Sequence, residues 1–182
     1  MLECVGEHGY AATTVPLVVA TARVSRNGYY VLFDDKLDCF LALCDQLADE
    51  LLGELFALQA SATWELALAE GMDRYLAWWR DRPSVAKAYL LEMPSAGPRA
   101  LEQRARQFGR FEELFRGLGA RARHEVPALA PLNPLATRLL VTGITELVAA
   151  EVREGRIEQL GELRDPLVEL ATGLLAPPAA AR

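Results

Sequence analysis

The sequence has few of the residues that build metal centres or disulfide frameworks. Its 182 residues include only three cysteines and two histidines. Cys4, Cys39 and Cys44 contain no C-x-x-C pair, so they do not show the spacing of a structural metal site. We therefore expect no metal and no cofactor, and three small thiols that are buried or half-buried in a reducing compartment. A redox switch is the less favoured alternative.

Long apolar runs and catalytic motifs are also missing. No apolar stretch approaches the roughly 20 residues of a membrane span, and residues 1–10 lack the charged-then-apolar layout of a signal peptide. The chain has no Gly-x-Ser-x-Gly elbow, no phosphate-cradling glycine loop and no His-Glu-x-x-His pair. These absences favour a cytoplasmic protein that is not an enzyme.

Positive charge is scarce as well. The formal net charge is −6, which argues mildly against a nucleic-acid partner. In the stretch 9–36 three basic residues face two acidic ones, which leaves a weak electrostatic footprint for phosphate contact. The basic residues are Arg23, Arg26 and Lys36, and the acidic ones are Asp34 and Asp35. Any DNA affinity of this stretch should therefore be modest.

What the chain does contain is a helix-turn-helix pattern over residues 13–36. A hydroxyl residue, Thr13 or Thr14, can cap a first short apolar helix. The break falls at residues 22–24, and Ser25 is the expected N-cap of a second helix. The outer face of that second helix carries Arg, Asn and Tyr side chains, which could enter a DNA major groove.

The expected DNA contacts of this pattern form two sets. Side chains on the first two turns of the second helix can reach base edges, whereas flanking residues meet phosphates. The base-edge set is Arg26, Asn27 and Tyr29, and the phosphate set is Thr14, Tyr30 and Lys36. Asp35, followed three residues later by Asp38, resembles a capping box that starts the next helix.

A set of residues in this region has a familiar order and spacing. These residues are Gly9–Tyr10, Ala12–Val15, Val18, Ala22, Val24–Ser25, Tyr30, Phe33 and Lys36. With them the segment resembles the DNA-binding domain of the tetracycline-repressor (TetR) family of bacterial transcription regulators. The resemblance implies an all-α protein in which a helix-turn-helix head, residues 1–38, joins a helical ligand-binding and dimerisation body, residues 39–182. It further implies double-stranded operator DNA, a second copy of the chain and a small hydrophobic effector as partners.

The segment departs from the family pattern in three places. Arg23 stands where the family usually has a turn glycine, and a left-handed residue other than glycine costs about 1–2 kcal/mol. Asn27–Gly28 replaces a common Gly-Thr pair, which removes a hydroxyl contact. Residues 2–8 supply only the last two turns of the family's first helix. A helical ligand-binding or interaction module with weakened or lost DNA binding therefore stays open as an alternative.

Beyond Lys36 the apolar residues recur at helical spacing. No strand pattern and no internal repeat stands out. The pattern predicts helices over 37–55, 61–82, 83–93, 99–125, 133–155 and 163–175, with breaks at 94–98 and 126–131.

Bulky aromatic and thioether side chains gather on three consecutive predicted helices of the body. Each alone is explained as readily by core packing, but together they are typical of helices that line an apolar pocket. The family resemblance implies a hydrophobic effector at this place. Arg104 could pair with an acidic group on such a ligand, although a solvated arginine is the simpler interpretation. The expected ligand-binding residues are Trp64, Tyr75, Trp78, Tyr89, Met93, Arg104, Phe108, Phe111 and Phe115.

The last two predicted helices carry more apolar residues than one buried face requires. They could form half of a four-helix interface between two subunits, with Gly143 permitting close backbone approach. The alternative is that both helices pack inside one subunit. The residues expected at the interface are Leu140, Ile144, Leu147, Val148, Leu167, Leu170 and Leu174.

These expectations combine into a ligand-responsive transcriptional regulator, a repressor rather than an activator, that binds operator DNA as a homodimer. A small apolar effector would release it by shifting the 37–55 helix. That shift would move the two recognition helices away from the spacing of about 34 Å that successive major grooves require.

Overall fold

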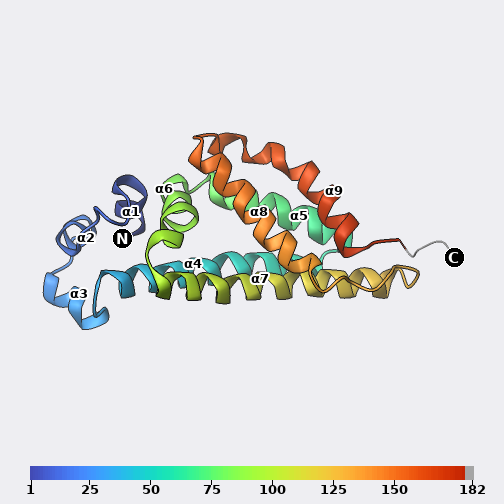
Figure 1. Cartoon of the computed structure of the whole chain (residues 1–182), viewed down its shortest axis with the longest axis horizontal. Helices are drawn as coiled ribbons and strands as arrows, with labels where there is room; N and C mark the ends of the chain where they lie inside the picture. Colours follow the sequence, from blue (N-terminus) through green and yellow to red (C-terminus); the bar gives the residue numbers. More distant parts are fainter. Residues whose placement is uncertain (179–182) are drawn as a thin grey trace.

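The computed structural model describes residues 1–178, which form a small helical head and a larger helical body (Figure 1). Residues 179–182, the end of the predicted body, lie outside that range. The head consists of α1 (Leu2–His8), α2 (Val15–Ala22) and α3 (Arg26–Leu32). The only extended pairing in the described part of the chain is an isolated bridge between Leu129 and Pro178. The all-α prediction is therefore confirmed.

The body is built on two long helices that run side by side, α4 and α7, with the remaining helices stacked over them (Figure 1). α4 also leaves the head directly, so one helix belongs to both regions. A short helical segment around α6 stands between the head and the rest of the body. The elements are α4 (Lys36–Ala57), η1 (Leu58–Ala60), α5 (Trp64–Arg80), α6 (Pro83–Ala86), the π-helical η2 (Lys87–Glu92), η3 (Met93–Ser95), α7 (Pro98–Glu125), α8 (Ala136–Arg153), η4 (Ile157–Leu163) and α9 (Arg164–Leu175).

Side-chain caps explain where the helices around the predicted turn begin. Thr14, Ser25 and Asp35 each accept a hydrogen bond from the backbone N–H three residues further on, at 3.4, 2.9 and 2.7 Å. Such caps satisfy amides that the helix itself leaves free. Of the two threonines considered, Thr14 is the cap, because the buried Thr13 hydroxyl donates instead to the Gly9 carbonyl.

The turn between α2 and α3 is left-handed, as the sequence predicted. Arg23 has φ 56° and ψ 38°, and it is the only residue other than glycine in the described chain with a positive φ. Its Cβ pays a steric cost of about 1–2 kcal/mol in this conformation. The head therefore folds the family-like turn without the glycine that would relax it.

Two separate apolar clusters hold the molecule together. The large one fills the body, and the small one lies between the head and the start of α4, around Cys4, Val18, Tyr29 and Cys39. All three cysteines are free and buried, as predicted. Burial raises the pKa of the Cys39 and Cys44 thiols, so they form thiolate poorly.

The head is seated on the body through α1. Gly6 lies so close to the segment around α6 that a Cβ at this position would come within 2.0 Å of the Ser84 carbonyl oxygen. The Tyr10 backbone N–H donates to the Glu92 carboxylate at 2.7 Å. A glycine contact and a charge-assisted hydrogen bond thus fix the head against α6 and η2.

Within residues 1–178, no helix has both the length and the apolar character that crossing a lipid bilayer requires. The same residues contain no cluster of side chains suited to hold a metal ion.

Candidate functional site

The outward face of α3 is the first candidate site. Arg26, Asn27, Tyr30 and Val31 are all exposed on it, whereas Tyr29 is not. The Arg26 guanidinium carbon lies 5.7 Å from the centroid of the Tyr30 ring, so the two side chains support one another. This face presents a cation, an amide, a phenol and a branched apolar group together.

Tyr29 corrects the prediction that it contacts base edges. Its side chain is only 4% exposed, and its hydroxyl donates to the Asp35 carbonyl at 3.1 Å. Its ring lies 5.4 Å from that of Phe33. Position 29 follows the Ser25 cap by one turn and precedes Phe33 by another, which places it on the inner face of the helix.

Lys36 corrects the prediction that it contacts phosphate. Its ammonium donates to the carbonyls of Tyr10 and Thr13 at 2.7 and 2.9 Å, and it stands 4.1 Å from the centroid of the Tyr10 ring. The charge is therefore used to close the head onto the start of α4. Thr14 stays exposed, and its capping oxygen keeps a hydrogen to donate.

Val31 is the residue on this face that the sequence analysis missed. It is 81% exposed, more than any other large apolar residue of the described chain. The signal was present in the helical period, because Val31 lies about 200° around the helix from the buried Tyr29. A search for polar groups alone overlooked it.

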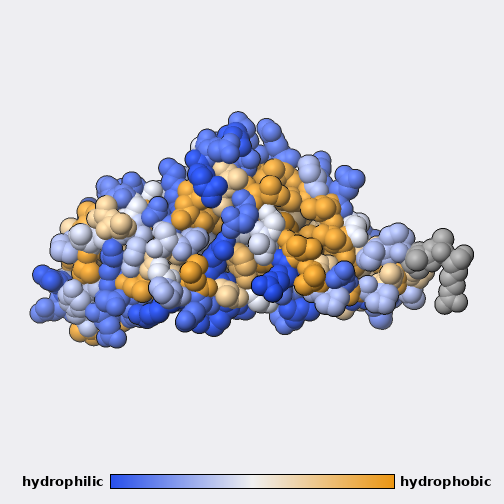
Figure 2. Space-filling view, viewed as in Figure 1, coloured by the Kyte–Doolittle hydropathy of each residue, from blue (hydrophilic) through white to orange (hydrophobic). Residues whose placement is uncertain are grey.

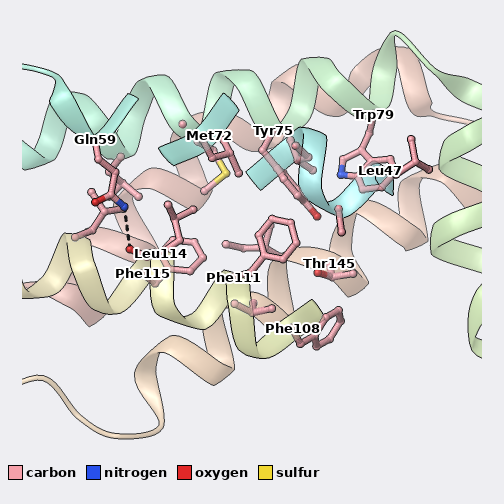
Figure 3. A pocket seen from close by; sticks show the side chains of 18 of the residues that line it. Leu47, Gln59, Met72, Tyr75, Trp79, Phe108, Phe111, Leu114, Phe115 and Thr145 are labelled. Atoms are coloured by element: carbon pink, nitrogen blue, oxygen red, sulfur yellow. Dashed lines mark hydrogen bonds between the residues drawn. The ribbon is translucent and has the colours of Figure 1, made fainter. Parts of the chain in front are cut away.

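The second candidate site is an internal cavity of the body, about 60 Å³ in volume (Figure 3). Side chains from α4, η1, α5, η2, α7 and α8 line it, and most of them are apolar. Of the nine predicted ligand-binding residues, five do line it: Tyr75, Tyr89, Phe108, Phe111 and Phe115.

The other four predicted ligand-binding residues lie elsewhere. Trp64, Trp78 and Met93 are buried in the body without lining the cavity. Trp78 lies under the Arg82 guanidinium, whose carbon is 4.5 Å from the centroid of its ring. Arg104 pairs with Glu146 at 2.7 Å and stacks on Phe108 at 4.4 Å, so it stands beside the cavity.

Trp79 and three leucines of α4 were missed as lining residues. Trp79 and Met72 share the face of Tyr75, since they lie four residues after it and three before it. The α4 residues, Leu47, Leu51 and Leu55, follow the same helical period. The helical period of α5 could have shown that Trp79, and not Trp78, shares the face of Tyr75. Which face of α4 lines the cavity depends on how the helices pack.

A chain of buried hydrogen bonds connects the cavity to α4. The Tyr89 hydroxyl, at the cavity wall, donates to Gln107 Oε1 at 2.7 Å. The amide nitrogen of Gln107 donates in turn to the Cys44 carbonyl of α4 at 3.2 Å. Gln103, one turn earlier on α7, donates to the Leu41 carbonyl at 2.6 Å. Burial raises the pKa of Tyr89, so its hydroxyl stays protonated as a donor.

The third candidate site is an apolar surface over α8 and α9, visible right of the centre in Figure 2. The burial of leucine, isoleucine and valine side chains on these helices corrects part of the predicted interface. Leu140, Ile144, Val148 and Leu167 are buried within the subunit, and Ile144 lines the cavity. Leu174 is half-buried, whereas Leu147 and Leu170 are exposed, and the exposed Leu135 and Leu139 join them. The helices are apolar on two sides, and the sequence did not show which side faces inward.

Comparison with known proteins bears on the head first. Residues 2–43 match the model of bacterial regulatory proteins, tetR family. The head and the first turns of α4 therefore correspond to the N-terminal region of that family. No curated protein matches it significantly.

Solved structures extend this tetR-family likeness to the body. FadR from Bacillus subtilis, in complex with stearoyl-CoA, is 18% identical with a TM-score of 0.83, over 93% of this chain and 92% of that one. FadR from Bacillus halodurans is 17% identical with a TM-score of 0.85, over 100% and 95%. PfmR from Thermus thermophilus is 17% identical with a TM-score of 0.60, over 99% and 98%. These likenesses establish that the chain shares its fold with these regulators.

Proposed function

We propose that the protein is a repressor that binds operator DNA through α3 as a homodimer, and that an acyl compound in the body cavity releases it. The observation that carries the proposal is that one helix, α4, lines the cavity and also begins at the head. The domain limits follow the same division, with residues 1–38 as the DNA-binding head and the rest as the ligand-binding and dimerisation body.

The outward face of α3 has the chemistry of direct base readout. Arg26 can donate to guanine and Asn27 can pair with adenine in the major groove, and Val31 can contact a thymine methyl group. Tyr30 and Thr14 supply hydroxyl donors for flanking phosphates. With Lys36 engaged inside the head, few cations remain for phosphate, so the proposal includes a modest affinity with a shallow salt dependence.

The lining of the cavity supports an effector with a long apolar part. The tetR-family relative from Bacillus subtilis, which shares the fold, holds stearoyl-CoA. The cavity of about 60 Å³ is far smaller than the roughly 300–1,000 Å³ of ordinary ligand sites. An acyl chain must therefore separate the helices that enclose it.

That separation would reach the head along α4. Leu47, Leu51 and Leu55 of α4 form part of the wall, and Gln107 connects the wall to the α4 backbone. The effector acts because its affinity for the two arrangements is unequal, and the arrangement with the larger cavity has the recognition helices displaced.

The apolar surface over α8 and α9 supports the homodimer. Leu135, Leu139 and Leu147 lie on one face of α8, and Leu170 lies on α9, all at least 47% exposed. Exposed leucines at this spacing on two adjacent helices suit a four-helix interface with a second copy. Sedimentation of Leu139→Glu should give a monomer, whereas Leu101→Glu, at an exposed leucine of α7, should leave a dimer.

The test of DNA recognition is a gel-shift titration against DNA that flanks the gene. Arg26→Ala should weaken binding about tenfold or more, the effect of losing one good base contact. Arg106→Ala, an exposed arginine of α7, serves as the matched control and should change little. Unchanged binding by Arg26→Ala would remove the assignment of α3.

The sparse positive charge of the head favours a second candidate, a ligand-binding module that has lost DNA recognition. Arg23 and Arg26 are the exposed cations of α2, α3 and their turn. This candidate predicts that the protein binds acyl compounds and dimerises, yet retains no fragment from a pool of random DNA sequences at low salt. Recovery of a preferred sequence would exclude it.

A further inference from the structure

The cavity is not uniformly apolar, because three of its polar side chains gather at one end. The Tyr75 hydroxyl, the Trp79 indole and the Thr145 hydroxyl lie together there, and Gln59 lies at the opposite end (Figure 3). The stretch between the two ends is lined by side chains such as Met72, Phe111 and Phe115. The site therefore has the form of an apolar channel with a polar terminus.

The polar end is short of internal partners. Trp79 is 3% exposed, and its indole N–H has no hydrogen-bond partner among the described residues. A buried donor without a partner loses about 1–3 kcal/mol, and beside a cavity it can be satisfied by a ligand atom that accepts. Burial raises the pKa of Tyr75, while the nearby Thr145 hydroxyl, Trp79 indole and Arg104 charge act against the rise. The phenol thus stays protonated and can donate as well.

Arg104 supplies a positive charge to this end. Its guanidinium carbon lies 4.4 Å from the centroid of the Phe108 ring, and Phe108 lines the cavity. The charge acts on both cavity tyrosines, Tyr75 and Tyr89, since it opposes the rise of their pKa values. Glu146 holds the arginine at 2.7 Å, but this carboxylate is 54% exposed and can be displaced.

We propose that the effector is oriented by its acyl oxygen, which lies at the end formed by Tyr75, Trp79 and Thr145 under the charge of Arg104. This inference rests on the proposed function and names the polar end group of its ligand. Indole and guanidinium groups only donate, so the matching end group must accept hydrogen bonds. A carboxylate and the carbonyl of a thioester both do so strongly, an alcohol oxygen accepts more weakly, and a protonated amine does not accept at all. The hydrocarbon tail extends toward Gln59.

Calorimetric titration of the lipid-stripped, full-length protein tests which polar end group is preferred. It compares four compounds that have the same chain length and different end groups. Hexadecanoate or hexadecanoyl-CoA should bind at least about tenfold more tightly than hexadecanol or hexadecylamine. Whichever of the two acyl compounds binds more tightly identifies the source of the acyl group. Equal binding of the alcohol or the amine would overturn the inference and leave an apolar effector standing. No binding of any of the four would instead refute the effector class of the proposed function.

Two substitutions that remove opposite charges, at Arg104 and at Glu146, distinguish a role in ligand binding from a structural role. Arg104→Gln should weaken hexadecanoate binding about tenfold, whereas Glu146→Gln should strengthen it, because the arginine loses its competing partner. Neither should change hexadecanol binding by more than about twofold. Arg110→Gln is the matched control, because Arg110 also lies on α7 but pairs with a carboxylate of α4. This change should have no effect on binding. If both Arg104→Gln and Glu146→Gln weaken binding, the pair only supports the fold and the inference is wrong.

Discussion

The head and the body of this protein are stabilised in different ways. The head shares a cluster of only four buried residues with the start of α4, and its helices depend on side-chain caps and on contacts with α6 and η2. The body has an extensive apolar core, yet that core encloses a cavity. Because the head has little core of its own and is held by α6, η2 and the start of α4, we expect it to respond when filling of the cavity moves those elements.

The largest expected effect is local to the head. Tyr29→Ala removes the largest side chain of the small cluster and should destabilise α2 and α3 by about 3–5 kcal/mol. Hydrogen exchange should show faster exchange in the head, with α5 and α8 unchanged. Tyr29→Phe, which loses only the bond to the Asp35 carbonyl, should cost about 1 kcal/mol. Equal loss of protection in head and body would show that the two do not differ as described.

The next effect concerns the junction. Gly6→Ala places a methyl group against the Ser84 carbonyl and should cost about 1–3 kcal/mol, because backbone on both sides must move. DNA affinity should change more than thermal stability of the body. Gly53→Ala in α4, where a Cβ meets nothing within 4 Å, is the control. A Gly6→Ala protein with unchanged DNA affinity would mean that the seat of α1 does not position the head.

A smaller effect is expected where the cavity meets α4. Gln107→Leu removes the bonds to Tyr89 and to the Cys44 carbonyl and should cost about 1–3 kcal/mol through the phenol left unpaired. The variant should still bind the acyl compound and DNA separately. Its DNA affinity should respond less to the acyl compound than that of the wild type. An undiminished response would exclude Gln107 as part of the connection.

The smallest effect is a gain. Arg23→Gly relaxes the left-handed turn, which should stabilise the head by about 0.5–1 kcal/mol once the greater freedom of glycine in the unfolded chain is subtracted. Hydrogen exchange of α2 and α3 measures this change. Destabilisation would show that Arg23 makes contacts that outweigh its strain.

The head could be predicted closely because its signals are local. Thr14, Ser25 and Asp35 begin helices where the sequence placed them, and the left-handed turn falls at Arg23. Tyr29 was placed wrongly because residues were selected by chemical type instead of by their angle around the helix, and the inward contacts of Lys36 depend on how the head packs on α4. One turn of helical geometry separates a base-reading position from a core position.

The helices of the body could be predicted from the sequence, but the side of each helix that faces inward could not. The helix over 37–55 is observed as Lys36–Ala57, and the break at 126–131 is present. The period of α5 places Trp79, and not the adjacent Trp78, on the face of Met72 and Tyr75, but only the packing of the helices shows that this face meets the cavity. The leucines of α8 posed the same difficulty, because that helix is apolar on two sides. The π-helical turn of η2 leaves no periodic signal that would distinguish it.

The connection between cavity and head is tested most directly by one titration. A labelled DNA fragment that the protein binds is mixed with a constant concentration of the protein. Its fluorescence anisotropy is then followed as hexadecanoate or hexadecanoyl-CoA is added. The account predicts that the acyl compound which binds the cavity lowers DNA affinity at least about tenfold, and that DNA lowers the affinity for the acyl compound by the same factor. Saturation of the cavity with no change in DNA affinity would contradict it.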